Sequence, residues 1–362
     1  MPRNFQNILR KGNAVMRILL GLSGGLDSTY AAYALQRQGH EVEGAVLLMH
    51  DYSSVNEARE SAESLGIPLH IIDCREAFED IVIENFVSEY SKARTPNPCV
   101  ICNRDVKFYY LLKYAKENGF DKIATGHYAG IKKLTDADGD YYGVVRGADT
   151  KKDQTYMLWR LSQDELASLI FPLEKLCKTE IREESRDIGF LAAERADSQE
   201  ICFLPDGDYA EFIEQRIGKS PRGNFVKDDG TVLGEHKGII HYTVGQRRGL
   251  GISSTSRIFV TKIDPETNTV VLSNNDSFAN RVHISGIIYS GMREAKDGEV
   301  RELLVKLRYA APPASARVTF FKDRAEILLN EPVRAVTPGQ SAVMYDGNLL
   351  VAGGFIDSAD FC

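Results

Sequence analysis

The sequence predicts an α/β protein that begins with a doubly wound parallel sheet and continues with a small β-rich central domain and a C-terminal antiparallel β-barrel. Three observations predict this order. Strand-like apolar runs alternate with helical stretches up to residue 205, as in a parallel sheet with helices on both faces. Glycine turns then separate short segments as far as residue 280. From residue 281 onward, short apolar runs with turn residues between them fit a small barrel best.

The first domain, residues 1–205 with residues 1–15 as a flexible extension, supplies the parallel strands. They are predicted at Arg17–Leu22, Glu41–Leu47, Leu69–Ile72 and Lys122–Ala124. A helix is predicted over Thr29–Gln38 and a charged helical region over Gln163–Gly189. Because ligands of such sheets bind beyond the carboxyl ends of the strands, the residues after the first and last of these runs are expected to face the same crevice.

The second and third domains are predicted at residues 206–280 and 281–362. The expected strands of the barrel are Val282–Tyr289, Glu302–Tyr309, Ser315–Phe321, Ala325–Leu329 and Ser341–Tyr345.

The composition is ordinary for a soluble protein, with 362 residues, 43% of them hydrophobic and 26% charged, and a net charge of −7. The negative net charge argues against a surface that is basic throughout and binds nucleic acid, but it is compatible with local basic patches. No apolar run is long enough to span a membrane, and residues 1–15 have no apolar core of a secretory signal. We therefore expect a cytoplasmic protein without a membrane partner.

The segment Ser23-Gly24-Gly25-Leu26-Asp27-Ser28 connects the first predicted strand to the first predicted helix. Paired glycines flanked by hydroxyls at a helix N-terminus present backbone N–H groups to a phosphate. The Gly-Lys-Ser/Thr ending of the ordinary P-loop is missing, so pyrophosphate is a better expectation than γ-phosphoryl transfer. Asp27 is the expected Mg²⁺ partner beside the phosphates. A glycine turn before a capped helix is the alternative interpretation.

Six cysteines in a chain of this length favour metal binding or catalysis over a secreted disulfide framework. Cys102 is predicted to open a helix over Asn103–Lys116, where a helix N-terminus lowers the pKa of a thiol. Cys99 and Cys102 have the two-residue spacing that zinc sites and dithiol redox pairs also use. The other isolated cysteines are expected to be structural: Cys74, Cys177 and Cys362.

The phosphate cradle is one of several sequence blocks that occur together in a known family. The others are Thr95–Asn103, Ala124–Tyr128, Lys152–Tyr156, Asp197–Phe203 and His241–Leu250. In this order the blocks resemble the tRNA-specific 2-thiouridylases, the uridine-34 thiolating members of the PP-loop ATP pyrophosphatases. The resemblance extends from about Met16 to the C-terminus. It implies a tRNA-uridine 2-sulfurtransferase that adenylates the C2 carbonyl of uridine 34 and replaces its oxygen with sulfur, releasing AMP and pyrophosphate.

The resemblance also implies roles for individual residues. ATP, with Mg²⁺ at Asp27, would be bound by Gly21, Leu22, Ser23, Gly24, Gly25, Leu26, Asp27, Ser28, Met49 and Gly126. The tRNA would be contacted by Asn97, Pro98, Cys99, His127, Lys152, Asp153, Gln154, Arg308, Tyr309 and Gln340. Because a base must leave its stack to be modified, the anticodon uridine is expected to flip into the site.

The same resemblance assigns the sulfur chemistry to cysteines. Cys202 would receive persulfide sulfur from a donor protein, such as a cysteine desulfurase or a persulfide carrier, and Cys102 would complete its release onto the uridine. One possible cycle ends with a Cys102–Cys202 disulfide. Many family members carry aspartate where this chain has Cys99. Three thiolates, from Cys99, Cys102 and Cys202, are enough to hold a [4Fe–4S] cluster with one iron open to sulfide, as in related thiolases, so both routes stay open.

The family implies the tRNAs for lysine, glutamate and glutamine, contacted at the anticodon stem-loop. Two other classes of protein fit parts of the sequence. A PP-loop ligase that forms amide or amine bonds would use the same adenylation but would have no use for the three cysteines. A non-catalytic RNA-binding or iron-sensing module would keep the cysteines and the barrel but would tolerate loss of Asp27. Exchange of pyrophosphate with ATP that depends on tRNA separates the three classes.

Overall fold

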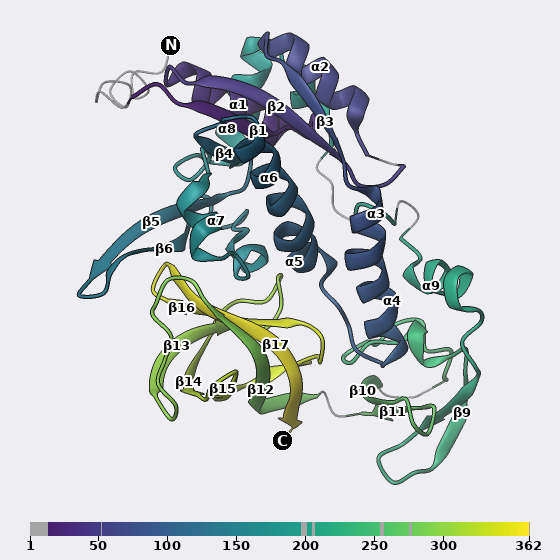
Figure 1. The fold of residues 1–362 in the computed structure, drawn as a ribbon. Helices are drawn as coiled ribbons and strands as arrows, with labels where there is room; N and C mark the ends of the chain where they lie inside the picture. The colour runs from purple at the N-terminus through teal and green to yellow at the C-terminus, as the bar shows by residue number, and fades with distance from the viewer. Residues whose placement is uncertain are drawn as a thin grey trace. The chain divides into compact units, whose positions relative to one another are not determined.

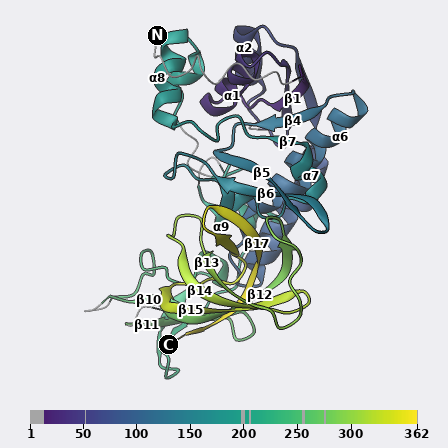
Figure 2. The same ribbon diagram turned by 90° about the vertical axis from the view of Figure 1, so that its left-hand side faces the viewer.

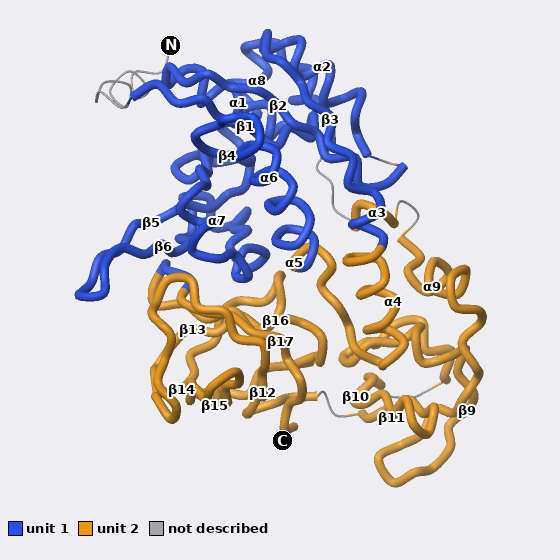
Figure 3. Tube along the Cα trace, in the orientation of Figure 1, with its two compact units in different colours: residues 1–79, 101–199, 348–350 blue, residues 80–100, 200–347, 351–362 orange. Residues whose placement is uncertain are grey.

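The computed structural model describes residues 14–51, 53–196, 201–204, 207–253, 257–274 and 277–361 (Figure 1, with a second view in Figure 2). The chain divides into two compact units, which are described separately (Figure 3). Unit 1 comprises residues 1–79, 101–199 and 348–350, and unit 2 comprises residues 80–100, 200–347 and 351–362. The predicted boundary residue Pro205, the start of the predicted extension and Cys362 lie outside the described residues. The three-domain division stays a prediction.

Unit 1 contains the predicted parallel sheet, in the strand order β3-β2-β1-β4-β7. All neighbouring strands in it are parallel. The strands are β1 (Arg17–Gly21), β2 (Glu41–Leu48), β3 (Leu69–Asp73), β4 (Lys122–Thr125) and β7 (Leu169–Ile170). The doubly wound sheet is confirmed, with β1 at its centre.

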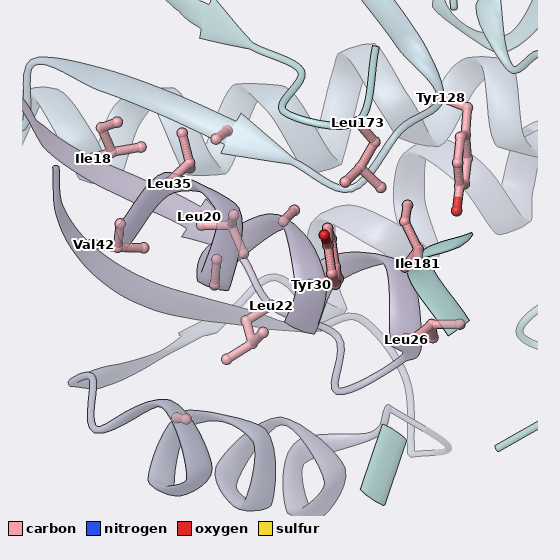
Figure 4. Packing of buried hydrophobic residues seen from close by; sticks show 14 of the residues in the cluster. Ile18, Leu20, Leu22, Leu26, Tyr30, Leu35, Val42, Tyr128, Leu173 and Ile181 are labelled. Atoms are coloured by element: carbon pink, nitrogen blue, oxygen red, sulfur yellow. The ribbon is translucent and has the colours of Figure 1, made fainter. Parts of the chain in front are cut away.

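The helices of unit 1 pack on this sheet through apolar side chains. Leu20 of β1, Tyr30 of α1 and Ile181 of α8 belong to one buried cluster, part of which is shown in Figure 4. Burying each leucine or isoleucine contributes about 2 kcal/mol. The α-helices are α1 (Leu26–Arg37), α2 (Val55–Leu65), α3 (Arg75–Phe78), α6 (Tyr109–Glu117), α7 (Gln163–Ser168) and α8 (Lys178–Ile188). Helical turns also form at Thr155–Leu158 and Leu191–Glu194, and a π-helical segment at Asn103–Phe108. A second π-helical segment, Glu79–Ile83, belongs to unit 2 after its first residue.

The predicted helical region over Gln163–Gly189 is wrong in its middle. The chain leaves α7 after Ser168, pairs as β7 with β4, and begins α8 only at Lys178. Pro172 disfavours the helical conformation for the residue before it. The edge of the parallel sheet provides the alternative pairing.

A long antiparallel hairpin in unit 1 was not among the predicted elements. It consists of β5 (Ala129–Asp136) and β6 (Gly139–Arg146). Gly139 at its turn has φ +104°, a backbone conformation that favours glycine. The dipeptide Asp138-Gly139 is a known hairpin signal and was available in the sequence.

Unit 2 contains helices α4 (Glu84–Ser91) and α9 (Tyr209–Ile217), a helical turn at Ile239–His241, and a small sheet in the order β10-β11-β8-β9. The rings of Tyr90 in α4 and Tyr209 in α9 stack with centroids 4.6 Å apart. The strands of this sheet are β8 (Gly223–Val226), β9 (Val232–His236), β10 (Phe259–Asp264) and β11 (Thr269–Ser273). This is the β-rich central region that the glycine turns predict.

The predicted antiparallel barrel is confirmed in the C-terminal part of unit 2. Its strands follow the order β12-β15-β14-β13-β16-β17, and β12 also pairs with β17, which closes the barrel. They are β12 (Phe278–Tyr289), β13 (Val300–Lys306), β14 (Ala314–Phe320), β15 (Arg324–Arg334), β16 (Ser341–Asp346) and β17 (Leu349–Phe361). β17 was not predicted. β13 is shorter than predicted because Val305 pairs with Ala314, so Arg308 and Tyr309 lie in the connection after the strand.

Candidate functional site

The predicted cradle is the loop between β1 and α1, at the carboxyl edge of the sheet. Gly24 has φ +77°, and a Cβ there would lie 2.3 Å from the main-chain carbonyl carbon of Glu57. Only glycine fits such a position. α1 begins at Leu26, after Gly25 in an extended conformation (φ −75°, ψ 163°). The first N–H groups of α1, which have no partner within the helix, are therefore available beside the loop for an anion.

Hydroxyl groups hold the cradle in one shape. Ser28 Oγ accepts a hydrogen bond from the Ser23 N–H at 3.2 Å and donates to the Gly25 carbonyl at 3.1 Å. Thr29 Oγ1 donates to the same carbonyl at 2.9 Å and lies 3.0 Å from Ser61 Oγ in α2. These bonds form within the protein itself, so the loop is preorganised for its ligand.

The segment after β4 lies against the first turn of α1, as the sheet topology predicts. A Cβ at Gly126 would lie 2.7 Å from the main-chain carbonyl carbon of Asp27 and 2.8 Å from the Ser28 nitrogen. Glycine at this position therefore allows two backbones to approach closely. The structure thus brings Gly126 to the cradle.

Asp27 has two protein partners that connect distant parts of unit 1. The Tyr128 hydroxyl donates to its Oδ1 at 2.8 Å, and Lys178 Nζ lies 2.9 Å from its Oδ2. The cradle sequence itself contains no lysine, and Lys178 reaches Asp27 from the start of α8. No local sequence pattern could have identified Lys178, because its contact with Asp27 spans 151 positions.

His127 is half-buried behind the cradle. Its Nδ1 lies 2.8 Å from Thr125 Oγ1, and its ring contacts those of Phe108 and Phe171. Burial, together with the nearby Lys107 ammonium, lowers the pKa of His127 to about 3. The imidazole is neutral at physiological pH, so any contact of His127 with RNA would be a hydrogen bond rather than an ion pair.

Met49 and Cys102, predicted respectively as an adenosine contact and a catalytic thiol, lie side by side in unit 1. The Cys102 thiol is 3.7 Å from the Met49 sulfur. Met49 follows directly after β2, and the Ser53 hydroxyl accepts a hydrogen bond from its N–H at 3.0 Å. Cys102 is buried, with 7% of its surface exposed. The predicted nucleotide pocket and the predicted nucleophile therefore share a boundary.

The predicted start of the helix at Asn103 is wrong. Helix α5 spans Pro98–Cys102 and continues through the π-helical segment into α6, so Cys102 is not at a helix N-terminus. Proline is favoured at the first helical position, and Pro98 was the available signal. Cys99, which is exposed, stands in the first turn instead. The argument that a helix N-terminus favours the thiolate thus applies to Cys99.

Cys202 belongs to unit 2 and is exposed. The next residue, Phe203, is buried and packs edge-on against Phe86 of α4, with ring centroids 5.3 Å apart. It also packs in a tilted arrangement against Phe212 of α9, at 5.4 Å. The polar residues just before this pair, 197–200, lie outside the described residues. Phe203 therefore anchors the segment while Cys202 stays accessible.

Gln340, a predicted tRNA contact, holds the loop that carries another predicted tRNA contact, Asn97, in unit 2. Its Nε2 donates to the carbonyls of Thr95 at 2.9 Å and Pro96 at 3.1 Å. Asn97, the next residue, is buried. The loop before α5 is therefore positioned by the segment between β15 and β16.

Arg308 and Tyr309, two further predicted tRNA contacts, have different surroundings. Arg308 Nη2 donates to the Val244 carbonyl at 3.1 Å and to the Thr337 hydroxyl, so it joins two loops of unit 2. Tyr309 is 39% exposed, and the Lys306 ammonium lies 5.4 Å from its ring centroid. Tyr309 is thus the better placed of the two to stack on a base.

The segment Lys152–Gln154, predicted to contact tRNA, lies in unit 1 beside Tyr128. Asp153 is buried; its Oδ1 accepts bonds from the N–H and the hydroxyl of Thr155, and its Oδ2 lies 3.3 Å from Arg146 Nε. The side chain of Asp153 therefore shapes the loop from inside. Lys152 and Gln154 flank it.

The cysteines with described positions are thiols rather than disulfides. Burial raises the pKa of Cys74 to about 12, in keeping with the structural role expected for it, and Cys177 immediately precedes α8. Within the described parts of the chain, no group of three or more His, Cys, Asp or Glu side chains is arranged to hold a metal ion. Among the same residues, no helix has the length and apolar character needed to cross a membrane.

A parallel sheet with a Ser-Gly-Gly loop between its central strand and a helix defines a PP-loop enzyme that uses ATP. Family models agree on this architecture. A model described as a tRNA methyl transferase HUP domain matches residues 16–206. A tRNA methyl transferase PRC-barrel domain matches residues 210–274, and an aminomethyltransferase beta-barrel domain matches residues 287–356.

Relatives identify the family. The chain is 40% identical over 358 residues to the tRNA-specific 2-thiouridylase MnmA of Clostridium botulinum, covering 94% of this chain and 98% of the relative. It is 41% identical to that of Carboxydothermus hydrogenoformans, covering 94% and 97%. A solved 4-thiouridine synthetase–RNA complex with bound ATP has 21% identity and a TM-score of 0.37, covering 55% of this chain and 50% of that one. The chain belongs to the tRNA-specific 2-thiouridylase family.

Proposed function

We propose that this member of the 2-thiouridylase family adenylates the C2 carbonyl of uridine 34 in the tRNA anticodon and then replaces its oxygen with sulfur. The observation that carries the proposal is the arrangement in unit 1. A preorganised phosphate cradle and a buried thiol are both present, and Met49 contacts that thiol. Adenylation is needed because oxide and hydroxide are poor leaving groups at neutral pH, whereas AMP leaves readily.

The description of two family models as methyl transferases suggests a different reaction. A methyl transfer needs neither a pyrophosphate cradle nor a nucleophilic sulfur at the base. Cys102 beside Met49 and the exposed Cys202 favour sulfur transfer, in agreement with the names of the relatives.

In the first step, the uridine O2 attacks the α-phosphorus of ATP and pyrophosphate leaves. The loop and the N-terminus of α1 would bind the departing phosphates. Asp27 supports Mg²⁺, because one carboxylate together with phosphate oxygens is a usual donor set for this ion, which would neutralise phosphate charge when bound. Met49 and Gly126 would border the adenosine.

In the second step, a persulfide on Cys202 supplies sulfur. Its terminal sulfur attacks C2, and AMP departs with the former carbonyl oxygen. The Cys102 thiolate then attacks the inner sulfur of Cys202, which breaks the S–S bond, leaves the thiocarbonyl on the base and forms a Cys102–Cys202 disulfide. An external thiol reduces this disulfide. A donor protein, either a cysteine desulfurase or a persulfide carrier, would recharge the exposed Cys202.

Cys99 supports a second route. Cys99 and Cys102 are one helical turn apart in α5 and suit a shared metal, and with Cys202 they would hold a [4Fe–4S] cluster whose open iron carries sulfide when bound. Among the residues that the structure describes, no such three-residue group is assembled.

The substrates we propose are the tRNAs for lysine, glutamate and glutamine in the cytoplasm, each presenting a flipped uridine. The tRNA contacts would be Asn97, Pro98, Cys99, His127, Lys152, Asp153, Gln154, Arg308, Tyr309 and Gln340.

The test is thiolation of unmodified tRNA by protein purified without oxygen, together with ATP–pyrophosphate exchange and assays for iron and acid-labile sulfide. We expect exchange that requires tRNA, and 2-thiouridine at position 34. Iron-free protein that is active and tolerates Cys99→Ala establishes the persulfide route. Iron and activity lost together in Cys99→Ala, Cys102→Ala and Cys202→Ala establish the cluster route. Exchange without tRNA, or no 2-thiouridine, contradicts the proposed function.

A further inference from the structure

Lys178 places a half-buried positive charge at the edge of the phosphate cradle. Its side chain is 13% exposed, and its ammonium lies 2.9 Å from Asp27 Oδ2 and 6.0 Å from the ring centroid of Tyr128. Asp27 stands in the first turn of α1, where the N–H groups of the helix attract anions. A lysine in this position is a natural partner for phosphate oxygens, because its three donors can contact phosphate and carboxylate together.

Asp149 fixes the start of the helix that carries Lys178. Its Oδ2 accepts a hydrogen bond from the Lys178 N–H at 3.0 Å. Its Oδ1 accepts bonds from the N–H groups of Lys151 at 3.1 Å and Lys152 at 3.2 Å. One carboxylate therefore connects α8 to the Lys152–Gln154 segment.

A second connection joins the same segment to the cradle. Gln154 Oε1 accepts a bond from the Tyr128 N–H at 2.9 Å, and the Gln154 N–H donates to the Tyr128 carbonyl at 3.3 Å. The Tyr128 hydroxyl donates to Asp27. These contacts, the bonds that Asp149 accepts from Lys178 and Lys152, and the Lys178–Asp27 pair form a closed ring within unit 1.

We propose that Lys178 contacts the β- and γ-phosphates of ATP, and that Asp149 is a positioning residue through which tRNA docking at Lys152–Gln154 orients Lys178. This inference rests on the proposed function, since it assumes that this segment contacts tRNA. In the absence of nucleotide, the ammonium pairs with Asp27. When ATP binds, its phosphate oxygens accept further charge-assisted bonds from the same ammonium.

The ring gives tRNA a route to the phosphates. An RNA phosphate that binds Lys152 shifts the loop whose N–H groups donate hydrogen bonds to Asp149. Because the same carboxylate accepts a bond from the first residue of α8, the shift also moves Lys178. We expect this coupling to raise the affinity for ATP about tenfold when a substrate tRNA is bound.

The first test separates a phosphate contact from a structural role. Binding of ATP, pyrophosphate and AMP to the full chain is measured by calorimetry for the wild type, Lys178→Ala, Lys178→Arg and the control Lys175→Ala, whose side chain is exposed. We expect Lys178→Ala to weaken ATP and pyrophosphate about 10- to 100-fold and to leave AMP within about twofold. Lys178→Arg should recover part of the loss. Unchanged ATP affinity, or an equal loss for AMP, overturns the assignment.

The second test concerns Asp149. The affinity for α,β-methylene ATP, which cannot release pyrophosphate, is measured by calorimetry with and without saturating tRNA in the wild type, Asp149→Asn, Asp149→Glu and the control Asp138→Asn at the exposed tip of the β5–β6 hairpin. We expect tRNA to tighten binding of the analogue about tenfold in the wild type, Asp149→Asn to lose most of this gain with the melting temperature nearly unchanged, and Asp149→Glu to retain part of it. An equal gain in the wild type and Asp149→Asn overturns the coupling. A wild type without tRNA-dependent exchange instead defeats the proposed function itself.

Discussion

The nucleotide cradle of unit 1 and the Cys202 segment of unit 2 are built in opposite ways. The cradle is braced by its own hydroxyls and by the backbone of α2, so that its shape is set before ATP arrives. Cys202 stands exposed beside one buried aromatic anchor, Phe203. The difference matches the two tasks that we propose for them. Stabilising a departing pyrophosphate needs fixed donors, whereas accepting sulfur from another protein needs an accessible thiol.

The largest expected effect is a loss of thiolation without a loss of pyrophosphate exchange. Cys202→Ala should lower thiolation at least about 1,000-fold because the sulfur acceptor is lost, while tRNA-dependent exchange of pyrophosphate stays within about twofold. Thiolation is followed by mass spectrometry of digested tRNA. Cys74→Ala, at a buried cysteine that is expected to be structural, serves as the control and should be as active as the wild type. Loss of exchange in Cys202→Ala would show that the two regions do not act independently.

A smaller contrast concerns the reactivity of the thiols. At pH 8, iodoacetamide should modify Cys202 at least about 100-fold faster than Cys74, because Cys74 is buried and burial raises its pKa to about 12. Peptide mass spectrometry at timed intervals measures both rates in one sample of folded protein. In denaturant the two rates should converge, and persistence of the difference there would contradict an explanation based on burial.

The rigidity of the cradle is tested at Gly24. Gly24→Ala should lower exchange at least about tenfold and reduce the free energy of unfolding by more than the about 1 kcal/mol expected for strain alone, because the added Cβ meets the backbone of Glu57. Gly119 has a similar φ of +70° with open space around it, so Gly119→Ala isolates the strain. Equal losses of stability in the two variants, with exchange intact, would mean that the backbone of the cradle adjusts to the added Cβ.

The smallest effect is on pH dependence. Burial and Lys107 hold the pKa of His127 at about 3, below its ordinary value of 6.5. The unfolded chain therefore binds the proton more readily, so the contribution of neutral His127 is fully present above pH 6.5 and is lost as pH falls toward 3. Urea unfolding across this range should show a slope of up to about one proton that His127→Gln removes. Identical slopes for the two proteins would refute this assignment.

Features set by local sequence were predictable. The parallel sheet followed from alternating apolar runs, and the cradle followed from glycines and hydroxyls after the first of them. Cys102 was misplaced because Pro98 was not recognised as the first residue of a helix. β7 spans two residues, too few for a periodic signal.

Contacts between distant segments were not predictable. Nothing near Lys178 in the sequence indicates that it meets Asp27, because α8 must first pack on α1. β17 contains Gly353-Gly354, which interrupts the usual strand pattern, and a Cβ at Gly354 would lie 3.0 Å from the Ser285 carbonyl oxygen in β12. Close backbone approach, rather than propensity, therefore explains that part of the strand.

The contact between Met49 and Cys102 limits how the enzyme can be engineered. An analogue-sensitive variant, one that accepts ATP with a bulky group on its adenine, needs a hole beside the base. Of the two residues proposed to border the adenosine, Gly126 has no side chain to remove, so the hole would be made at Met49. Truncating Met49 also removes the sulfur that contacts the buried Cys102 thiol at 3.7 Å. A substitution that changes the nucleotide preference is therefore expected to change the reactivity of the Cys102 thiol as well.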